Sequence, residues 1–484
     1  MLKINQRYEK TFSKLPVKVL QIGEGNFLRA FADWIVESAN RKGVFNGSVI
    51  ISQPIEKGMC EKLNEQDCMY TVLMRGKEQG KTVERFERIT SVSRCINPYT
   101  DYRELIKAIC LPSLEVIISN TTEAGIAYNK GDRLDKTPQT SYPAKLTALL
   151  YKRYLEFNGD MDKGLLILPV ELIERNGDNL KMIVHRYAQE WALGDEFTNW
   201  LQTACGFANT LVDRIVTGFP SDEYPEIEKR LGYEDKLLVT CEPFLFWVIE
   251  CDEKWIEKFP VDRIGLNIIF TDDMTAYRTR KVRILNGAHT ASVLAAYHCG
   301  CDTVLDMMND TQMLTYITKV IFDEIVPNIN LPASELDYFA RAVIERFENP
   351  FIKHRLLDIS LNSVSKFKAR CLESLLDYKD ANGSLPPVLT NGLAALIYFY
   401  KGRFIDGKYI GGRNEEPYEI RDNPEVLSFM AKVWGEDGTA KAVLGNRNFW
   451  DMDLNTVEGL TQRVGSCLAL IESKGMKAAV EAVL

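Results

Sequence analysis

The glycine turn after the first strand-like run constrains the fold of this chain more than any other feature. Residues 16–22 form a short apolar run, Gly23 and Gly25 follow it, and residues 26–36 have the spacing of an amphipathic helix. A strand, a glycine turn and a helix begin a βαβ unit, in which glycines let the backbone approach a pyrophosphate at the helix N-terminus. Leu28 replaces the third glycine of the full fingerprint, and glycines also serve such turns without any ligand. The turn predicts an α/β fold with Gly23 and Gly25 as candidate cofactor-binding residues.

Strand-like and helical segments alternate through the first half of the chain. This alternation predicts a Rossmann-like α/β domain over residues 1–274. We expect further strands at residues 47–52, 70–74, 115–119, 164–169 and 237–241, and helices at residues 102–110, 143–157 and 178–193.

Two strand ends carry polar residues suited to a nucleotide. Gln53 follows the second expected strand, where a dinucleotide site usually has an acid for the adenosine ribose. No arginine stands in that turn to hold a 2′-phosphate, so NAD is the expected cofactor in preference to NADP. Thr121, Thr122 and Glu123 follow the strand at 115–119, at the edge where parallel sheets bind ligands. The same residue types are also typical of a loop that caps a helix.

Long helical segments replace the strand-like runs from residue 275 onward. This change predicts an all-α C-terminal domain over residues 275–484, with a surface excursion at 402–422, which is rich in glycine and charge. Helices are expected at residues 281–298, 313–326, 334–347, 387–401, 423–435 and 456–474.

The first of these helices carries three polar side chains that could run a proton transfer, Lys281, Asn286 and His289. In an α-helix they would fan over one side. Their apolar neighbours predict burial, which lowers the pKa of an amine and makes it a usable base near neutral pH. The pattern is equally typical of a core helix with a snorkelling lysine, a capping asparagine and a hydrogen-bonded histidine.

Charge and hydropathy limit the partners of the chain. A net charge of −8 gives no general attraction to nucleic acid or to an anionic membrane, so a small molecule is the expected partner. The N-terminus lacks the apolar core of a signal peptide, and the longest apolar run, residues 393–400, is too short to cross a bilayer. We expect a cytoplasmic protein, either a monomer or a small homo-oligomer.

The eleven cysteines include no C-x-x-C pair, which favours reduced thiols over a disulfide framework. Residues 298–301, His-Cys-Gly-Cys, place three soft ligands closer together than structural zinc sites usually do. We therefore expect buried thiols at a helix end and no metal.

Five segments carry a family resemblance: residues 22–31 (IGEGNFLRAF), 119–126 (SNTTEAGI), 141–147 (SYPAKLT), 212–218 (VDRIVTG) and 285–291 (LNGAHTA). In this order they resemble the mannitol dehydrogenase family of long-chain polyol dehydrogenases. The resemblance runs over nearly the whole chain. Within the family, the segments are most similar to the branch that interconverts D-tagaturonate and D-altronate.

The resemblance implies an NAD-dependent enzyme that reversibly reduces tagaturonate to altronate, a step in galacturonate breakdown, with a sugar acid as its substrate. By the same resemblance, Lys281 is the general base that takes the hydroxyl proton. Asn286 would stabilise the developing alkoxide, and His289 would orient the substrate.

The resemblance also extends the set of expected binding residues. Next to the glycine turn, Asn26, Phe27 and Arg29 are expected to contact the cofactor. Asp213 and Lys366 fall where the family has further active-site groups, and we expect them to bind the substrate.

Two departures from the family pattern bear on the substrate. Leu172 stands where mannitol dehydrogenases have an asparagine, and Asp358 stands where they have a substrate-binding arginine. A carboxylated sugar needs a cation, and His354, Arg355 and Lys366 are near in sequence. We therefore expect some of these three residues to bind the carboxylate.

Two alternative functions stay open from the sequence. One is a sister oxidoreductase that acts on mannonate and fructuronate, or on uncharged mannitol. The other is a non-catalytic protein that senses a nucleotide or a sugar acid.

Overall fold

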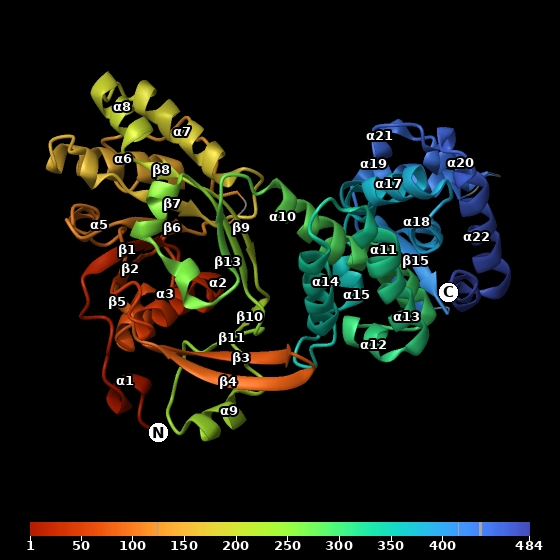
Figure 1. Cartoon of the computed structure of the whole chain (residues 1–484), viewed down its shortest axis with the longest axis horizontal. Coiled ribbons are helices and arrows are strands. Elements are labelled where there is room, and N and C mark those ends of the chain that lie inside the picture. The colour runs from red at the N-terminus through yellow and green to blue at the C-terminus, as the bar shows by residue number, and fades with distance from the viewer. Residues whose placement is uncertain (123, 415, 435–437) are drawn as a thin grey trace. The chain divides into compact units, whose positions relative to one another are not determined.

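The computed structural model describes residues 1–122, 124–414, 416–434 and 438–484. The chain divides into two compact units, Met1–Met274 and Thr275–Leu484 (Figure 1). The first unit is built on a Rossmann-type parallel sheet and the second is mainly helical. The fold class expected from the sequence is therefore confirmed.

The main sheet of the first unit consists of β1 (Val17–Ile22), β2 (Ser48–Ser52), β5 (Val92–Ile96), β6 (Val116–Ser119), β7 (Leu166–Pro169) and β8 (Gly206–Phe207). These strands are all parallel, in the order β5-β2-β1-β6-β7-β8. The chain order reverses on either side of β1, and such a switch point is where α/β sheets bind ligands. Ile22 pairs with Ser52 on one side and Ser119 on the other, so the loops after β1, β2 and β6 share one edge.

The helices of this unit are α1 (Ile4–Arg7), α2 (Asn26–Ala30), α3 (Ala32–Arg41), α4 (Cys60–Glu65), α5 (Tyr102–Ile109), α6 (Tyr142–Glu156), α7 (Asn176–Glu190), α8 (Asp195–Thr203), α9 (Tyr224–Leu231) and the 3-10 turns η1 (Met161–Lys163), η2 (Glu253–Lys258) and η3 (Val261–Ile264). Helices pack on both faces of the main sheet (Figure 1). Neighbouring residues of β1 point to opposite faces: Val19 joins a core with Ile35 of α3, whereas Leu20 joins a core with Leu146 of α6. The central strands are mostly apolar because both faces of the sheet are covered.

Two smaller sheets complete the first unit, built from β3 (Tyr70–Glu78), β4 (Lys81–Ile89), β9 (Asn209–Asp213), β10 (Val216–Gly218), β11 (Val239–Cys241), β12 (Phe246–Glu250) and β13 (Ile268–Thr271). Their strand orders are β10-β11-β3-β4 and β13-β12-β9. The sequence predicted β3 and β11 but not β4, because much of β4 is exposed and its polar residues hide the strand pattern.

The second unit contains α10 (Thr275–Arg280), η4 (Lys281–Asn286), α11 (Gly287–Cys299), α12 (Val304–Asn309), α13 (Thr311–Lys319), η5 (Val320–Ile325), η6 (Val326–Asn328), α14 (Ala333–Phe347), α15 (Leu356–Ile359), α16 (Ser363–Phe367), η7 (Lys368–Leu372), α17 (Glu373–Asn382), α18 (Pro387–Phe399), α19 (Pro424–Val433), α20 (Thr439–Leu444), α21 (Arg447–Trp450), η8 (Leu454–Thr456), α22 (Leu460–Lys474) and α23 (Met476–Glu481). The mostly buried helices α11 and α18 form its centre, where Gly392 lets the two backbones approach closely beside Ala291. Along the described chain, no helix combines the length and the apolar character that a membrane span requires.

The segment 402–422, which was expected to be a surface excursion, is largely exposed, but the sequence did not predict that it forms strands. It forms a three-stranded antiparallel sheet of β14 (Gly402–Ile405), β15 (Lys408–Arg413) and β16 (Glu416–Glu419). Asp406 and Gly407, both with positive φ, make the two-residue turn between β14 and β15. An Asp-Gly pair between two short runs is a hairpin signal, and the glycine-rich composition of the segment masked it.

Three stretches of the second unit are π-helical: η4, η5 and η7. Residues 281–298 were expected to form one α-helix, but the structure divides them into the π-helical η4 and the α-helix α11. The π-helix is rare and is found mostly as short insertions at functional sites. Its i→i+5 hydrogen bonds bring residues five apart over one another, which is the spacing between Lys281 and Asn286.

Candidate active site

A cavity of about 370 Å³ lies at the carboxyl edge of the main sheet in the first unit. The turn after β1, the loop after β2, the loop after β6 and the start of α6 all contribute to its lining. Gly23, Gly25, Thr121 and Thr122, which were predicted from the sequence, are brought together there. The cavity therefore occupies the switch point at which a doubly wound sheet binds a nucleotide.

The two glycines of the turn meet different demands. Gly23 has a φ of +126°, and a Cβ on it would lie 2.8 Å from the carbonyl oxygen of Asn120, so a side chain is excluded by strain and by contact. Gly25 has an ordinary φ of −65°, and a Cβ on it would meet nothing within 4 Å. Gly23 shapes the turn, and Gly25 leaves the space beside the cavity empty. This arrangement fits a dinucleotide pyrophosphate.

The loop after β6 is held by Glu171, whose role the sequence did not predict. The buried carboxylate of Glu171 accepts hydrogen bonds from the backbone N–H and the hydroxyl of Thr121, at 3.0 and 2.9 Å, and from the hydroxyl of Ser119 at 3.1 Å. Both donors of Thr121 are thus used within the protein. Thr122 is exposed in the cavity lining with a φ of 78°, and Glu123 lies outside the described residues.

The side chains expected to bind the cofactor next to the glycine turn contact other protein groups instead. Arg29 is 1% exposed and donates hydrogen bonds to the carbonyl oxygens of Glu24 and Leu237 and to the side chain of Asn26. Phe27 stacks on Phe31 with ring centroids 4.9 Å apart. Asn26, Phe27 and Arg29 therefore contribute to the shape of the turn, and none of them lines the cavity.

Gln53 is likewise engaged within its own loop. Its amide nitrogen donates to the carbonyl oxygens of Ile55 and Glu56, at 2.8 and 2.9 Å, and its amide oxygen accepts from the backbone N–H of Cys60 at 3.1 Å. The side chain is 2% exposed. Its polar groups hold the loop after β2 in place, so the ribose contact expected of Gln53 has no support in this geometry.

Lys145 and Glu24 are cavity-lining residues that the sequence analysis missed. The Lys145 amine donates to the carbonyl oxygen of Pro54 at 2.6 Å and to the Tyr99 hydroxyl at 2.7 Å, and burial lowers its pKa to about 8. Burial also raises the pKa of Glu24, whose carboxylate accepts a hydrogen bond from the Met59 backbone at 3.2 Å. Lys145 lies within the family-like segment 141–147, which was the signal that could have identified it.

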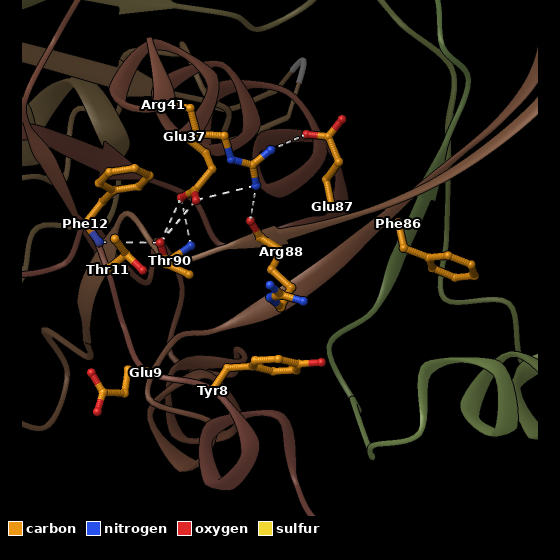
Figure 2. A pocket seen from close by; sticks show the side chains of 10 residues that line it. All are labelled: Tyr8, Glu9, Thr11, Phe12, Glu37, Arg41, Phe86, Glu87, Arg88 and Thr90. Atoms are coloured by element: carbon orange, nitrogen blue, oxygen red, sulfur yellow. Dashed lines mark hydrogen bonds and ion pairs between the residues drawn. The ribbon is translucent and has the colours of Figure 1, made fainter. Parts of the chain in front are cut away.

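A second cavity, of about 500 Å³, lies between the N-terminal segment and β4 (Figure 2). Three of its charged side chains, those of Glu37, Arg41 and Glu87, have partners within the protein. Glu37 accepts hydrogen bonds from the backbones of Thr90 and Ser91 at 2.8 and 2.9 Å, and Arg41 pairs with Glu87 at 2.7 Å. Arg88 lies over the ring of Tyr8, with its guanidinium carbon 3.9 Å from the ring centroid.

In the second unit, η4 holds Lys281 and Asn286, both half-buried, five residues apart. Gly287 follows, and the carbonyl oxygen of Arg370 would lie 3.0 Å from a Cβ on it, so η7 packs directly against this segment. The hydroxyl of Thr290 donates to the carbonyl oxygen of Asn286 at 2.8 Å. The packing fixes the segment that presents the lysine and the amide.

His289 lies one turn further along, among aromatic rings. It stacks on Phe347 with ring centroids 4.0 Å apart and meets His354 edge-on at 5.7 Å. Burial, reinforced by nearby positive charges, holds the pKa of His289 well below its usual range, so the imidazole is neutral at pH 7. Its Nε2 atom is buried without a hydrogen-bond partner in the described part of the chain.

The expected substrate-binding residues divide between the two units. His354 and Lys366 are half-buried in the second unit, and both act electrostatically on His289. Asp213 is 7% exposed in the first unit, where it ends β9. Leu172 and Asp358, at the positions that depart from the family pattern, are both exposed.

Metal ligands do not cluster in the described residues, where no group of three His, Cys, Asp or Glu side chains is suited to hold an ion. His298 contacts the Tyr418 hydroxyl at 3.3 Å instead. All eleven cysteines are free thiols.

A Rossmann-type unit with a glycine-turn cavity, joined to a helical unit that presents a lysine, an amide and a neutral imidazole, defines a dehydrogenase. Two family models match the chain in succession. The model of the mannitol dehydrogenase Rossmann domain matches residues 17–263, and the model of the mannitol dehydrogenase C-terminal domain matches residues 273–471. The chain belongs to the mannitol dehydrogenase family.

Curated relatives share much of the sequence. The chain is 44% identical over 477 residues to proteins named altronate oxidoreductase from Escherichia coli O17:K52:H18 and from Shigella flexneri, covering 97% of this chain and 97% of each relative.

Solved structures share the fold at lower identity. A D-sorbitol dehydrogenase in substrate-free form has a TM-score of 0.80 at 20% identity, covering 97% of this chain and 96% of that one. The mannitol 2-dehydrogenase of Pseudomonas fluorescens, in a ternary complex with NAD and D-mannitol, has a TM-score of 0.67 at 20% identity, covering 98% and 95%.

Proposed function

We propose that this protein is an NAD-dependent oxidoreductase that reversibly reduces D-tagaturonate to D-altronate. One observation carries the proposal: the second unit holds Lys281 and Asn286 at π-helical spacing beside a neutral His289, within a chain that is 44% identical over 97% of its length to altronate oxidoreductases. The glycine-turn cavity of the first unit supports a dinucleotide as the redox partner.

The roles proposed for Lys281, Asn286 and His289 of the second unit follow from the proton and the charge that alcohol oxidation must move. Oxidation of an alcohol removes a proton from the hydroxyl and a hydride from its carbon, and NAD supplies the hydride acceptor when bound. Lys281, in its neutral form, takes the hydroxyl proton, and the same group returns it in the reverse direction. Asn286 donates an amide hydrogen bond to the oxygen on which negative charge develops. Neutral His289 has a ring nitrogen without a hydrogen-bond partner among the described residues, and this nitrogen would orient a substrate hydroxyl.

The roles of the first unit concern the cofactor. The backbone at Gly23 and Gly25 would hold the pyrophosphate, and Thr122 and Lys145 line the same cavity. Glu24 lines it as well, and its carboxylate disfavours an additional 2′-phosphate by like charge. This charge, rather than a contact from Gln53, supports NAD over NADP. Asp213 stays a proposed substrate-binding residue of this unit.

The test is a substrate panel with the purified enzyme. Altronate, mannonate and mannitol are each offered with NAD and with NADP, and altronate with NAD is expected to give the highest kcat/KM. Lys281→Ala should lower kcat by about 10³-fold, because a positioned general base contributes 10²–10⁴-fold.

Other outcomes of this panel would contradict the proposal. A preference for mannonate or mannitol would assign the enzyme to a sister activity. Tight NADH binding without turnover of any sugar acid or polyol would indicate a sensor.

A further inference from the structure

Positive side chains gather around His289 in the second unit. They come from the C-terminal part of α14, the loop before α15, and the segment formed by α16 and η7. After burial, the charges of Arg346, Arg370 and Lys366, and that of His354 when it is protonated, lower the pKa of the imidazole. A neutral imidazole therefore lies in a region of positive potential.

Arg370 differs from the neighbouring Arg283, although both side chains are at least half-buried. Arg283 is paired with two carboxylates, those of Glu373 and of Asp377, the latter at 2.6 Å. The guanidinium of Arg370 has one hydrogen bond within the described part of the chain, a long one of 3.4 Å to the hydroxyl of Thr290. A guanidinium has five N–H donors, so most of its capacity is unused.

Lys366 places a second positive charge one helical turn before Arg370. Its amine donates to the carbonyl oxygen of Ile359 at 2.8 Å. Burial lowers the pKa of Lys366, the charge of Arg370 lowers it further, and Asp422 opposes both. Like charges four residues apart on a helix repel each other, and burial increases the cost. An anion bound between the two would relieve that repulsion.

Arg370 also lies beside the segment that presents the proton-transfer groups. Its backbone carbonyl faces Gly287, and the thiol of Cys371 donates to the carbonyl oxygen of Gly287 at 3.4 Å. Its guanidinium reaches Thr290, whose hydroxyl is bonded to the carbonyl oxygen of Asn286. A substrate in contact with Asn286 and His289 would therefore lie close to this guanidinium.

We propose that Arg370, together with Lys366, binds the carboxylate of the substrate and selects sugar acids over uncharged polyols. The inference rests on the proposed function, because it concerns the substrate of the same site. A planar guanidinium can bind both carboxylate oxygens, and a point-charge amine adds to the attraction. The exposed Asp358, at the position of the family arginine, cannot supply a cation, so Arg370 provides it from the next helical segment.

The experiment compares Arg370→Met with the wild-type enzyme at saturating NAD, using altronate and mannitol as substrates. We expect the KM for altronate to rise about 100-fold, with a smaller change in kcat, because a charge-assisted bidentate contact is lost. The kcat/KM ratio of altronate to mannitol should fall by a similar factor. Arg370→Lys should recover part of the lost affinity for altronate, since lysine restores the positive charge but cannot form the bidentate hydrogen bonds of a guanidinium.

Arg341→Met is the matched control, because this exposed arginine pairs with Asp337 and its loss changes the net charge equally. It should leave both KM values unchanged. NADH affinity and Tm, measured for each variant, separate a local effect from misfolding.

The inference is overturned if Arg370→Met leaves the KM for altronate unchanged, or lowers kcat/KM for altronate and mannitol by the same factor. A failure of the proposed function is visible in the wild-type enzyme, as absent turnover of altronate. In that case calorimetric titration of the NADH complex with altronate decides the point: weaker binding in Arg370→Met supports the carboxylate site, and equal binding, or none to either form, rejects it.

Discussion

At the scale of single residues, the glycine-turn cavity shows that a residue's place in a motif does not by itself determine what its side chain contacts. Gln53 follows β2, where a ribose ligand was expected, but its amide is bonded to Ile55, Glu56 and Cys60. Lys145 lies in the first turn of α6, a helix that was predicted from the sequence, and its amine lines the cavity beside Pro54 and Tyr99. Such partners lie across loops whose course the local sequence does not determine.

Gly23 and Gly25 provide a matched pair of substitutions. Gly23→Ala places a side chain at a φ of +126° and against the Asn120 carbonyl, so we expect the free energy of unfolding to fall by about 3 kcal/mol. Gly25→Ala should change it by no more than about 1 kcal/mol, the usual cost of alanine at a helix N-cap. It should still weaken NADH binding at least about tenfold, because the methyl group enters space beside the cavity.

Urea denaturation and NADH titration of the two variants test this pair. Equal stability losses would contradict the distinct roles of the two glycines. Unchanged NADH affinity in Gly25→Ala would place the pyrophosphate elsewhere.

Lys145 should make cofactor binding depend on pH. Its pKa is lowered to about 8, so the amine is mainly charged at pH 7 and mainly neutral at pH 9. A cation lining the cavity attracts the pyrophosphate, and NADH affinity is expected to fall several-fold over that interval. Lys145→Met should bind more weakly at pH 7 and lose this pH dependence. Fluorescence titration of NADH at pH 7, 8 and 9 measures both effects, and an unchanged pH profile in the variant would exclude Lys145 as the titrating group.

At the scale of elements, the sequence pattern did not predict the three π-helical stretches. Apolar periodicity over 281–298 identified a buried helix, and the helix is present. The π-helix changes to an α-helix at Gly287, where η7, a segment far away in the sequence, packs against that glycine. Local propensity carries no signal for such an insertion.

Glu324 on η5 shows that a π-helical stretch can also stabilise a neighbouring helix through hydrogen bonds. Its buried carboxylate accepts hydrogen bonds from the backbone N–H groups of Val388 and Leu389, both at 2.7 Å, and so caps the N-terminus of α18. Burial, partly offset by these bonds, raises its pKa to about 7. The folded protein therefore binds a proton at this site that the unfolded chain has already released above pH 4.5.

The sign of the resulting pH dependence follows from proton linkage. Since the folded-state pKa is the higher one, the stability from protonated Glu324 is complete below about pH 4.5 and is lost as the pH rises through 7, by roughly 3 kcal/mol. Glu324→Gln removes this titration, so its free energy of unfolding should fall less steeply between pH 5 and 8. Urea unfolding across that range measures the difference, and parallel curves would show that Glu324 does not titrate there.

At the scale of the whole molecule, the two units are built from different secondary structure and place their polar groups differently. The first buries strands between helices and places its cavity where strand order reverses around β1. The second is built around the buried helices α11 and α18 and carries Lys281, Asn286 and Arg370 on short π-helical segments. The division follows the change from strand-like to helical periodicity near residue 275.

The sequence by itself determined the fold class, the glycine turn and the helix that carries Lys281, Asn286 and His289, because periodicity and glycine placement are local properties of the chain. The tertiary structure decided which polar groups remain available. Arg29 is bonded to the distant carbonyl oxygen of Leu237 and Gln53 is bonded within its own loop, whereas Lys145 lines the cavity and Arg370 has most of its donors unused among the described residues. Availability depends on the partners that packing brings within hydrogen-bond distance, and those partners are separated along the chain.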